Sequence, residues 1–145
     1  MPAKDQYHDV VKHALIKAGW TITHDPLFLR SGGVAFHIDL GAERVLGAEK
    51  AGQKIAVEIK GFQGSSLINA FHEAAGQFGN YNIVLEENDP ERMLYLAVPL
   101  DVYDAFFQLP FGQAAIRYHR LKLLVYRVTT EEIALWLPSM SIVRL

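Results

Sequence analysis

Hydrophobic and polar residues alternate in two stretches of the first half of the chain, which is the pattern of a strand with one buried face. Residues 34–40 place every second side chain on an apolar face and leave Asp39 on the opposite face. Residues 54–60 repeat the pattern, with Glu58 and Lys60 together on the polar face. Weaker patterns predict strands over residues 20–24 and 44–50, a loop over 25–33, and a hairpin turn at Ala51-Gly52.

Apolar residues recur at helical spacing in four other stretches. They predict a helix over residues 4–18 that ends at Gly19, and a helix from about 67 to 86 capped by Ser65 or Ser66. Residues 101–108 and 112–119 also look helical, with Pro110 between them. Strands are predicted over residues 93–98, 121–126 and 133–137. This order of elements predicts an α/β fold with a mixed sheet.

The composition narrows the class of protein. A length of 145 residues fits one domain over 1–145, and the absence of cysteine excludes disulfides and zinc–cysteine sites. No apolar run approaches the ~20 residues of a membrane helix, and the N-terminus lacks the apolar core of a secretory signal. We therefore expect a cytoplasmic protein that does not bind membranes. A net charge of −2 argues against binding nucleic acid by charge alone.

Two local patterns in the second half of the chain each allow two interpretations. Four basic residues lie in 117–127, with no acid between Ala105 and Thr130. They fit either a DNA-contact surface or a solvated helix end. The apolar residues between Phe106 and Phe111 fit the core, or else an oligomer or partner surface.

Three charged residues can meet at one sheet surface. Asp39 lies on the polar face of one strand, and a hairpin can bring it beside Glu58 and Lys60 on the next. Two carboxylates bind a hard cation such as Mg²⁺ or Mn²⁺ through oxygen, and the carbonyl of Ile59 can add a third oxygen ligand. Such a metal lowers the pKa of a bound water and stabilises charge on a phosphate, with Lys60 orienting the water.

The helix that follows adds two polar residues on one face, since Gln77 and Tyr81 are four positions apart. Gln77 can bind the attacking water or a phosphate, and Tyr81 can contact DNA. Each feature also has an ordinary explanation. Glu58 and Lys60 fit a solvated ion pair, Asp39 fits a turn before Gly41, and the helix positions fit a polar surface. Their order within 43 residues favours a nuclease site.

On these motifs the chain resembles the PD-(D/E)xK nuclease superfamily, which has the restriction-endonuclease-like αβββαβ core. The resemblance implies a divalent-metal-dependent DNA endonuclease with a short C-terminal addition to that core. It assigns catalysis to Asp39, Glu58, Lys60 and Gln77, metal binding to Asp39, Glu58 and Ile59, and DNA contact to Tyr81 and Lys60. One departure is that Ile38, rather than proline, precedes Asp39.

Several residues are second-tier candidates for the same site. The first helix of the superfamily often supplies another acidic residue, for which Asp5 and Asp9 are candidates, with His8 in a supporting role. His37 shares the polar face of Asp39, and Glu49 lies on the middle predicted strand. For each histidine a surface or structural role is the main alternative.

A closer resemblance, to the XisH family of fdxN-element excision controlling factors of cyanobacteria, extends over most of the chain. It is carried by the stretches Pro2–Asp5, Thr21–Leu27, Ile38–Glu43, Ile55–Lys60 and Leu94–Pro99. The resemblance implies a role in DNA rearrangement beside a site-specific recombinase and a companion protein, XisI. The competing function is a non-catalytic regulator with a nuclease fold that binds one of these partners. A homodimer would allow two sites to reach two DNA strands.

Overall fold

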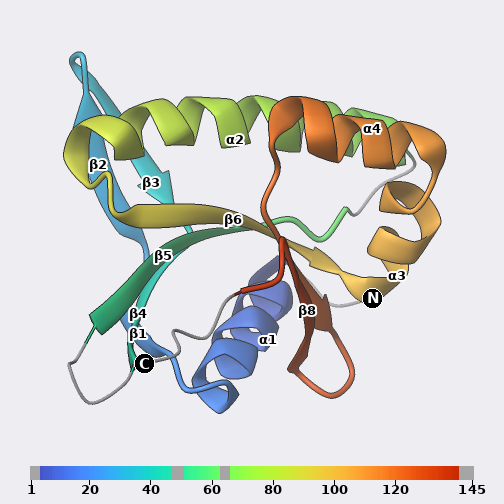
Figure 1. Cartoon of the computed structure of the whole chain (residues 1–145), viewed down its shortest axis with the longest axis horizontal. Coiled ribbons are helices and arrows are strands. Elements are labelled where there is room, and N and C mark those ends of the chain that lie inside the picture. Colours follow the sequence, from blue (N-terminus) through green and yellow to red (C-terminus); the bar gives the residue numbers. More distant parts are fainter. Residues whose placement is uncertain (1–3, 47–50, 63–65, 141–145) are drawn as a thin grey trace.

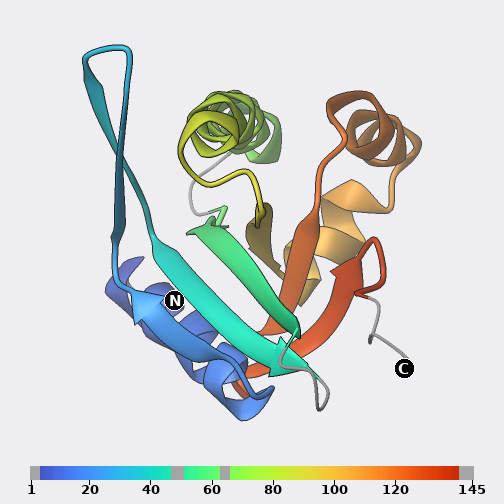
Figure 2. The same cartoon turned by 60° about the vertical axis from the view of Figure 1, so that its left-hand side comes forward.

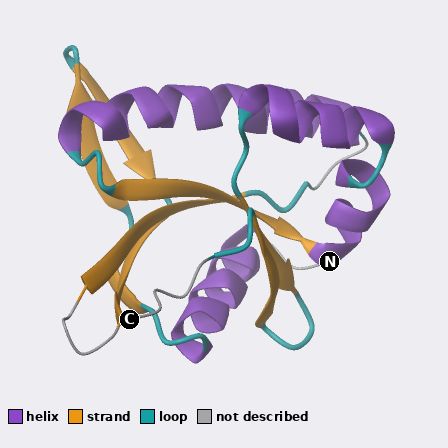
Figure 3. Ribbon diagram, viewed as in Figure 1, coloured by secondary structure: helices purple, strands orange, loops and turns teal. Residues whose placement is uncertain are grey.

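The computed structural model describes residues 4–46, 51–62 and 66–140. Its first half contains α1 (Lys4–Lys17), β1 (Thr21–His24), β2 (Leu27–Ser31), β3 (Val34–Ile38), β4 (Leu40–Leu46) and β5 (Ala51–Ile59). Its second half contains α2 (Leu67–Asn88), β6 (Arg92–Pro99), α3 (Leu100–Val102), the π-helical turn η1 (Tyr103–Phe107), α4 (Pro110–His119), β7 (Leu123–Arg127) and β8 (Glu132–Leu137). The expected α/β architecture is confirmed, as Figure 3 shows.

A mixed six-stranded sheet in the order β1-β4-β5-β6-β7-β8 forms the middle layer. The central pairs β5–β6 and β6–β7 are parallel, and the outer pairs are antiparallel. Helices α2 and α4 lie over one face and α1 over the other (Figure 1). The sheet is therefore mixed, as the sequence predicted, and is flanked by helices on both sides.

Alternation along the strands explains the two cores. In β5, Ile55 and Val57 belong to the cluster under α1, whereas Ala56 belongs to the cluster under α2. Strand β6 is apolar on both faces because it is covered on both: Leu96 faces the α2 cluster and Tyr95 the α1 cluster. The polar face of β5 thus points toward α2, which places Glu58 under that helix.

Two corrections concern the strand predicted over residues 34–40 and the loop predicted before it. This stretch is not continuous, because it breaks at Asp39 into β3 and β4, which belong to different sheets. The predicted loop over 25–33 is also wrong, since it contains β2, which pairs with β3 around a turn at Gly32 and Gly33. Both glycines have positive φ, 56° and 84°, which glycine adopts without strain. Figure 2 shows the β2–β3 ribbon projecting from the molecule.

A third correction concerns the turn predicted at Ala51-Gly52. Both residues belong to β5, where they pair with Leu46 and Val45 of β4. The connection between these strands falls at residues 47–50, outside the described residues.

The helix ends follow their local signals. Ser66 is confirmed as the cap of α2, because its Oγ accepts a hydrogen bond from the Asn69 N–H at 3.2 Å. Pro110 begins α4 rather than merely separating two helices, as suits a residue without an N–H. Within the described ranges, no helix has the length and apolar character needed to cross a membrane.

Candidate functional site

Asp39 and Glu58 face each other at one edge of the β4–β5 pair, where β4 begins and β5 ends. The register pairs Leu40 with Val57, so the next position along puts Asp39 opposite Glu58. The Asp39 N–H donates to Glu58 Oε1 at 3.2 Å, and the Ile59 N–H donates to Asp39 Oδ2 at 2.8 Å. These two hydrogen bonds bring the two side chains together, as expected from the hairpin between them, and their metal-binding and catalytic roles stay predictions.

The environment of Glu58 disfavours its charge. Its residue surface is 9% exposed. Burial, and then the neighbouring Asp39 charge, raises the pKa of Glu58 to about 8, against an ordinary value of 4.5. The Lys60 ammonium, 4.0 Å from Glu58 Oε2, acts in the opposite direction. The fold therefore places two carboxyl groups where both ionise only with positive charge nearby, and Lys60 supplies part of that charge.

Lys60 has a second acidic neighbour that the sequence analysis did not assign. Its Nζ donates to Glu73 Oε1 at 3.1 Å. Glu73 lies one helical turn before Gln77, on the same face of α2. The i, i+4, i+8 spacing of Glu73, Gln77 and Tyr81 is the signal that could have included it.

Of the other two members of that helix face, Tyr81 lies close enough to feel the carboxylate charges, and Gln77 lies between Tyr81 and Glu73 on the helix. Gln77 Oε1 is buried and has no hydrogen-bond partner among the described residues. The pKa of Tyr81 is raised to about 12 by burial, and then by the charges of Glu58, Asp39 and Glu73. Its ring also meets Phe36, with centroids 6.3 Å apart. The face of α2 that contacts Lys60 through Glu73 thus also carries a phenol near the carboxylates and a buried amide oxygen without a partner.

The donor set fits a magnesium-type cation. In the described residues no group of three or more His, Cys, Asp or Glu side chains could hold a metal ion, and the acidic groups that meet here are the two carboxylates of Asp39 and Glu58. Mg²⁺ is commonly held by one or two carboxylates and completes its shell with waters and substrate phosphates. Ile59 N–H is committed to Asp39, and a ligand role for its carbonyl stays a prediction.

Within the described part of the chain, no hydrogen bond, ion pair or ring contact joins a second-tier candidate to this cluster. His8 donates to Asp25 Oδ1 at 2.7 Å, where Lys12 also binds. Asp9 is exposed on α1, and His37 is exposed on β3, its ring 6.2 Å from that of Phe28. The side chain of Asp5 and all of Glu49 lie outside the described residues.

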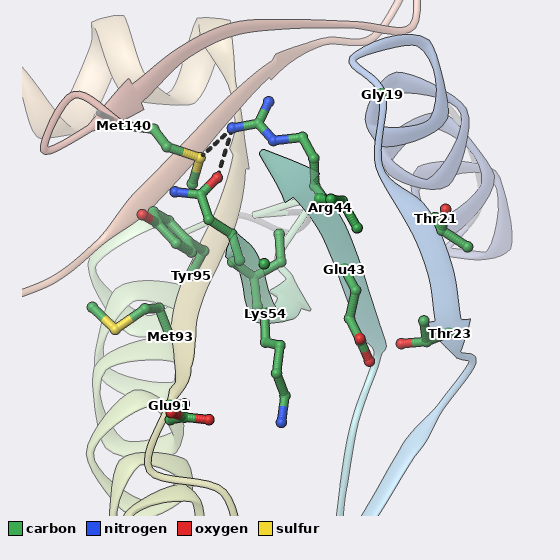
Figure 4. Close-up of a pocket in the computed structure, with 14 residues that line it drawn as sticks. Gly19, Thr21, Thr23, Glu43, Arg44, Lys54, Glu91, Met93, Tyr95 and Met140 are labelled. Carbon is green, nitrogen blue, oxygen red and sulfur yellow. Dashed lines mark hydrogen bonds between the residues drawn. The ribbon is translucent and has the colours of Figure 1, made fainter. Parts of the chain in front are cut away.

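A large cavity lies elsewhere, at the other end of β4 and β5 (Figure 4). It has a volume of about 900 Å³, and its lining includes Glu43, Arg44 and Lys54 but none of the clustered site residues. Arg44 is held by its own neighbours, donating to Gln53 Oε1 and the Met140 sulfur and lying 4.5 Å from the Trp20 ring centroid. This cavity is therefore separate from the candidate chemistry.

The structure also shows the surroundings of the apolar stretch 106–111 and the basic stretch 117–127, each of which allowed two interpretations. Phe106 and Phe107 are buried, whereas Leu109 and Phe111 are 51% and 54% exposed, so the apolar stretch is part core and part surface. In the basic stretch, Arg117, Arg120 and Arg127 are exposed at the end of α4 and on β7. Tyr118 beside them is 84% exposed.

Comparison with known proteins gives one family. A family model described as XisH protein matches residues 1–134. The chain is similar to the crystal structure of an XisH family protein from Nostoc punctiforme, with 49% identity, a TM-score of 0.84, and coverage of 91% of this chain and 98% of that one. It is equally similar to a fdxN element excision controlling factor protein from Anabaena variabilis, with 49% identity, a TM-score of 0.84, and coverage of 92% and 98%. No curated protein matches the chain.

Proposed function

The chain belongs to the XisH family, and from this premise we propose that it is a divalent-metal-dependent DNA endonuclease, or the nuclease subunit of a complex, that controls excision of a DNA element. The element excision is suggested by the name of the Anabaena relative, a fdxN element excision controlling factor. The nuclease activity is suggested by the candidate site and by its likeness to the PD-(D/E)xK arrangement on a restriction-endonuclease-like core.

One observation carries the proposal. The carboxyl groups of Asp39 and Glu58 meet beside the Lys60 ammonium, under a helix that presents the unpartnered Gln77 amide oxygen. A structural ion pair needs no second carboxylate, and burying two together costs stability. Such an arrangement is therefore better explained by a cation and a phosphate than by folding alone.

Each residue has a distinct role in the proposed reaction. Asp39 and Glu58 would hold Mg²⁺ or Mn²⁺, which when bound supplies an acidified water and a counter-charge for the scissile phosphate. Lys60 orients the attacking water or stabilises the developing charge. Gln77 Oε1 accepts a hydrogen bond from that water, and Tyr81 donates to the DNA backbone.

Cleavage assays with and without metal test the proposal. The purified full-length protein should nick or cut DNA in Mg²⁺ or Mn²⁺ and not in EDTA, and Glu58→Gln and Lys60→Met should each reduce the rate by at least about 100-fold. Gly76→Ala on the exposed face of α2 is the control, since nothing lies within 4 Å of the added Cβ. Full cleavage by both site variants would reject the site.

A regulator without catalysis is the second candidate function. It is favoured by the net charge of −2 and by the exposed apolar pair Leu109 and Phe111, which suit contact with a recombinase or an XisI-type partner better than contact with DNA. If it is correct, Asp39→Ala and Glu58→Ala proteins still support excision in cells. Phe111→Ser should then abolish both excision and co-purification with the partner.

A further inference from the structure

The β2–β3 ribbon, residues 27–38, is a projecting arm whose two faces differ in chemistry. Directly paired residues of an antiparallel ribbon share a face. Leu27 pairs with Ile38 and Leu29 with Phe36, and these residues are buried or half-buried. The opposite face consists of the pairs Phe28–His37 and Arg30–Ala35, all four of which are exposed.

The inner face is fastened to α2, so the arm is held in position. Asn88 donates to the Arg30 carbonyl at 3.0 Å, and Ser31 donates to Glu87. Phe36 meets the ring of Tyr81. These contacts therefore hold the arm, whose ribbon projects from the molecule in Figure 2, with its outer face exposed.

The outer face lacks acidic groups altogether. Residues 27–38 contain no Asp or Glu, while Arg30 and His37 both lie on the exposed side. In the described part of the chain no acid lies within ion-pair distance of the Arg30 guanidinium. Phe28 is 73% exposed beside the His37 ring. An unpaired guanidinium next to exposed rings is complementary to a polyanion with apolar base edges.

The arm also leads directly into the candidate site. Strand β3 ends at Ile38, and the next residue is Asp39. The major groove of duplex DNA admits a two-stranded ribbon. We propose that the outer face of the arm binds duplex DNA, with the ribbon in the major groove, Arg30 on the phosphates or a guanine edge, and Phe28 against the bases. This inference rests on the proposed function, because it names the surface that presents DNA to Asp39 and Glu58.

Binding measurements on the full-length Glu58→Gln protein test the arm without cleavage. Arg30→Ala and Phe28→Ala should each weaken binding of a labelled duplex oligonucleotide by about fivefold or more, the low end for losing a base contact. Arg30→Ala should also lower the slope of log affinity against log salt by about one if the guanidinium holds a phosphate. Arg117→Ala and Tyr118→Ala, on exposed positions of α4, are the matched controls and should bind normally.

Several results would overturn the arm proposal. One is unchanged duplex affinity of both arm variants, and another is a loss of binding confined to the α4 variants. The others are a loss of binding seen only with a single-stranded probe, and a Phe28→Ala variant that turns a dimer into a monomer at constant DNA affinity.

Cleavage by the chain with native Glu58 separates the two proposals. If it cuts DNA normally with Arg30→Ala and Phe28→Ala, the arm proposal fails and the nuclease stands. If it never cuts, yet the arm variants lose duplex binding, the nuclease fails and the arm stands.

Discussion

Glu58 is a carboxyl group buried next to another carboxyl group, and this has a measurable consequence for stability. The folded protein keeps the Glu58 proton up to about pH 8, whereas an unfolded glutamate releases it near 4.5. Folding therefore takes up a proton between these values. The free energy of unfolding of the metal-free protein should fall as pH rises across this window, and level off above it.

Glu58→Gln should remove this pH dependence. At pH 5 the variant and the native chain should melt at similar temperatures in EDTA, because Glu58 is then protonated. At pH 9 the variant should melt higher by at least about 3 °C, the shift that about 1 kcal/mol produces in a chain of this size. Melting curves by circular dichroism give the comparison, and a native chain that is more stable at pH 9 than at pH 5 would contradict it.

Added Mg²⁺ should reverse the order of melting temperatures of the native chain and Glu58→Gln at high pH. Mg²⁺ requires the deprotonated carboxylate, so it should raise the melting temperature of the native chain more at pH 8.5 than at pH 5.5. Glu58→Gln should show little response at either pH. Equal stabilisation of both proteins would mean that Mg²⁺ binds elsewhere.

Adding a single Cβ atom at two glycines, Gly61 and Gly76, tests how tightly the chain packs around each of them. A Cβ at Gly61, the residue after Lys60, would lie 2.7 Å from Tyr7 Cε2, whereas a Cβ at Gly76 of α2 meets nothing within 4 Å. Gly61→Ala should therefore destabilise the fold by about 1–3 kcal/mol. Gly76→Ala should stabilise it by about 0.5–1 kcal/mol, because it removes backbone freedom from the unfolded chain. Urea unfolding of the two variants measures both signs.

At the scale of elements, α2 connects the site to the rest of the fold. Ser66 caps it just before the face that carries Glu73, Gln77 and Tyr81. Ser66→Ala should cost about 1 kcal/mol of stability, since the Asn69 N–H loses its partner. Ser66→Asp should retain the cap, so urea unfolding of the pair distinguishes a capping loss from a general intolerance at this position.

The helices and strands also show which patterns in the sequence were sufficient to predict the candidate site. Alternation predicted the polar face of β5, and helical spacing placed Gln77 and Tyr81 above it. The break at Asp39 could not be predicted, because the alternation runs through it unchanged and only the pairing partner differs. Glu73 was not assigned because an acidic residue on an exposed helix face is ordinary, and only the distance to Lys60 distinguishes it.

At the scale of the whole molecule, Arg92 joins three strands to the end of α2. It is 6% exposed, and donates to the Ile55 carbonyl of β5 at 2.9 Å and to Asp89 at 3.0 Å. Its Nη2 lies 3.5 Å from Glu43 of β4. Arg92→Met should cost about 3 kcal/mol, because Asp89 and the carbonyl are left without this partner. Arg117→Met on the exposed end of α4 is the control, and should change stability by less than about 0.5 kcal/mol in the same urea experiment.

The short distance along the chain between the two carboxylates affects how the molecule assembles. Asp39 and Glu58 are 19 residues apart and meet when a single hairpin closes, a contact with a low entropic cost of loop closure. Helix α2, which lies over them, connects β5 to β6, and the parallel pairing of these two strands holds the helix in place. We therefore expect the carboxylates to meet during folding while water still surrounds them, and to become hard to ionise only when α2 docks. If the proposed metal binds, a cation acquired in the open hairpin would be enclosed as the helix closes, and the site would be loaded early in folding.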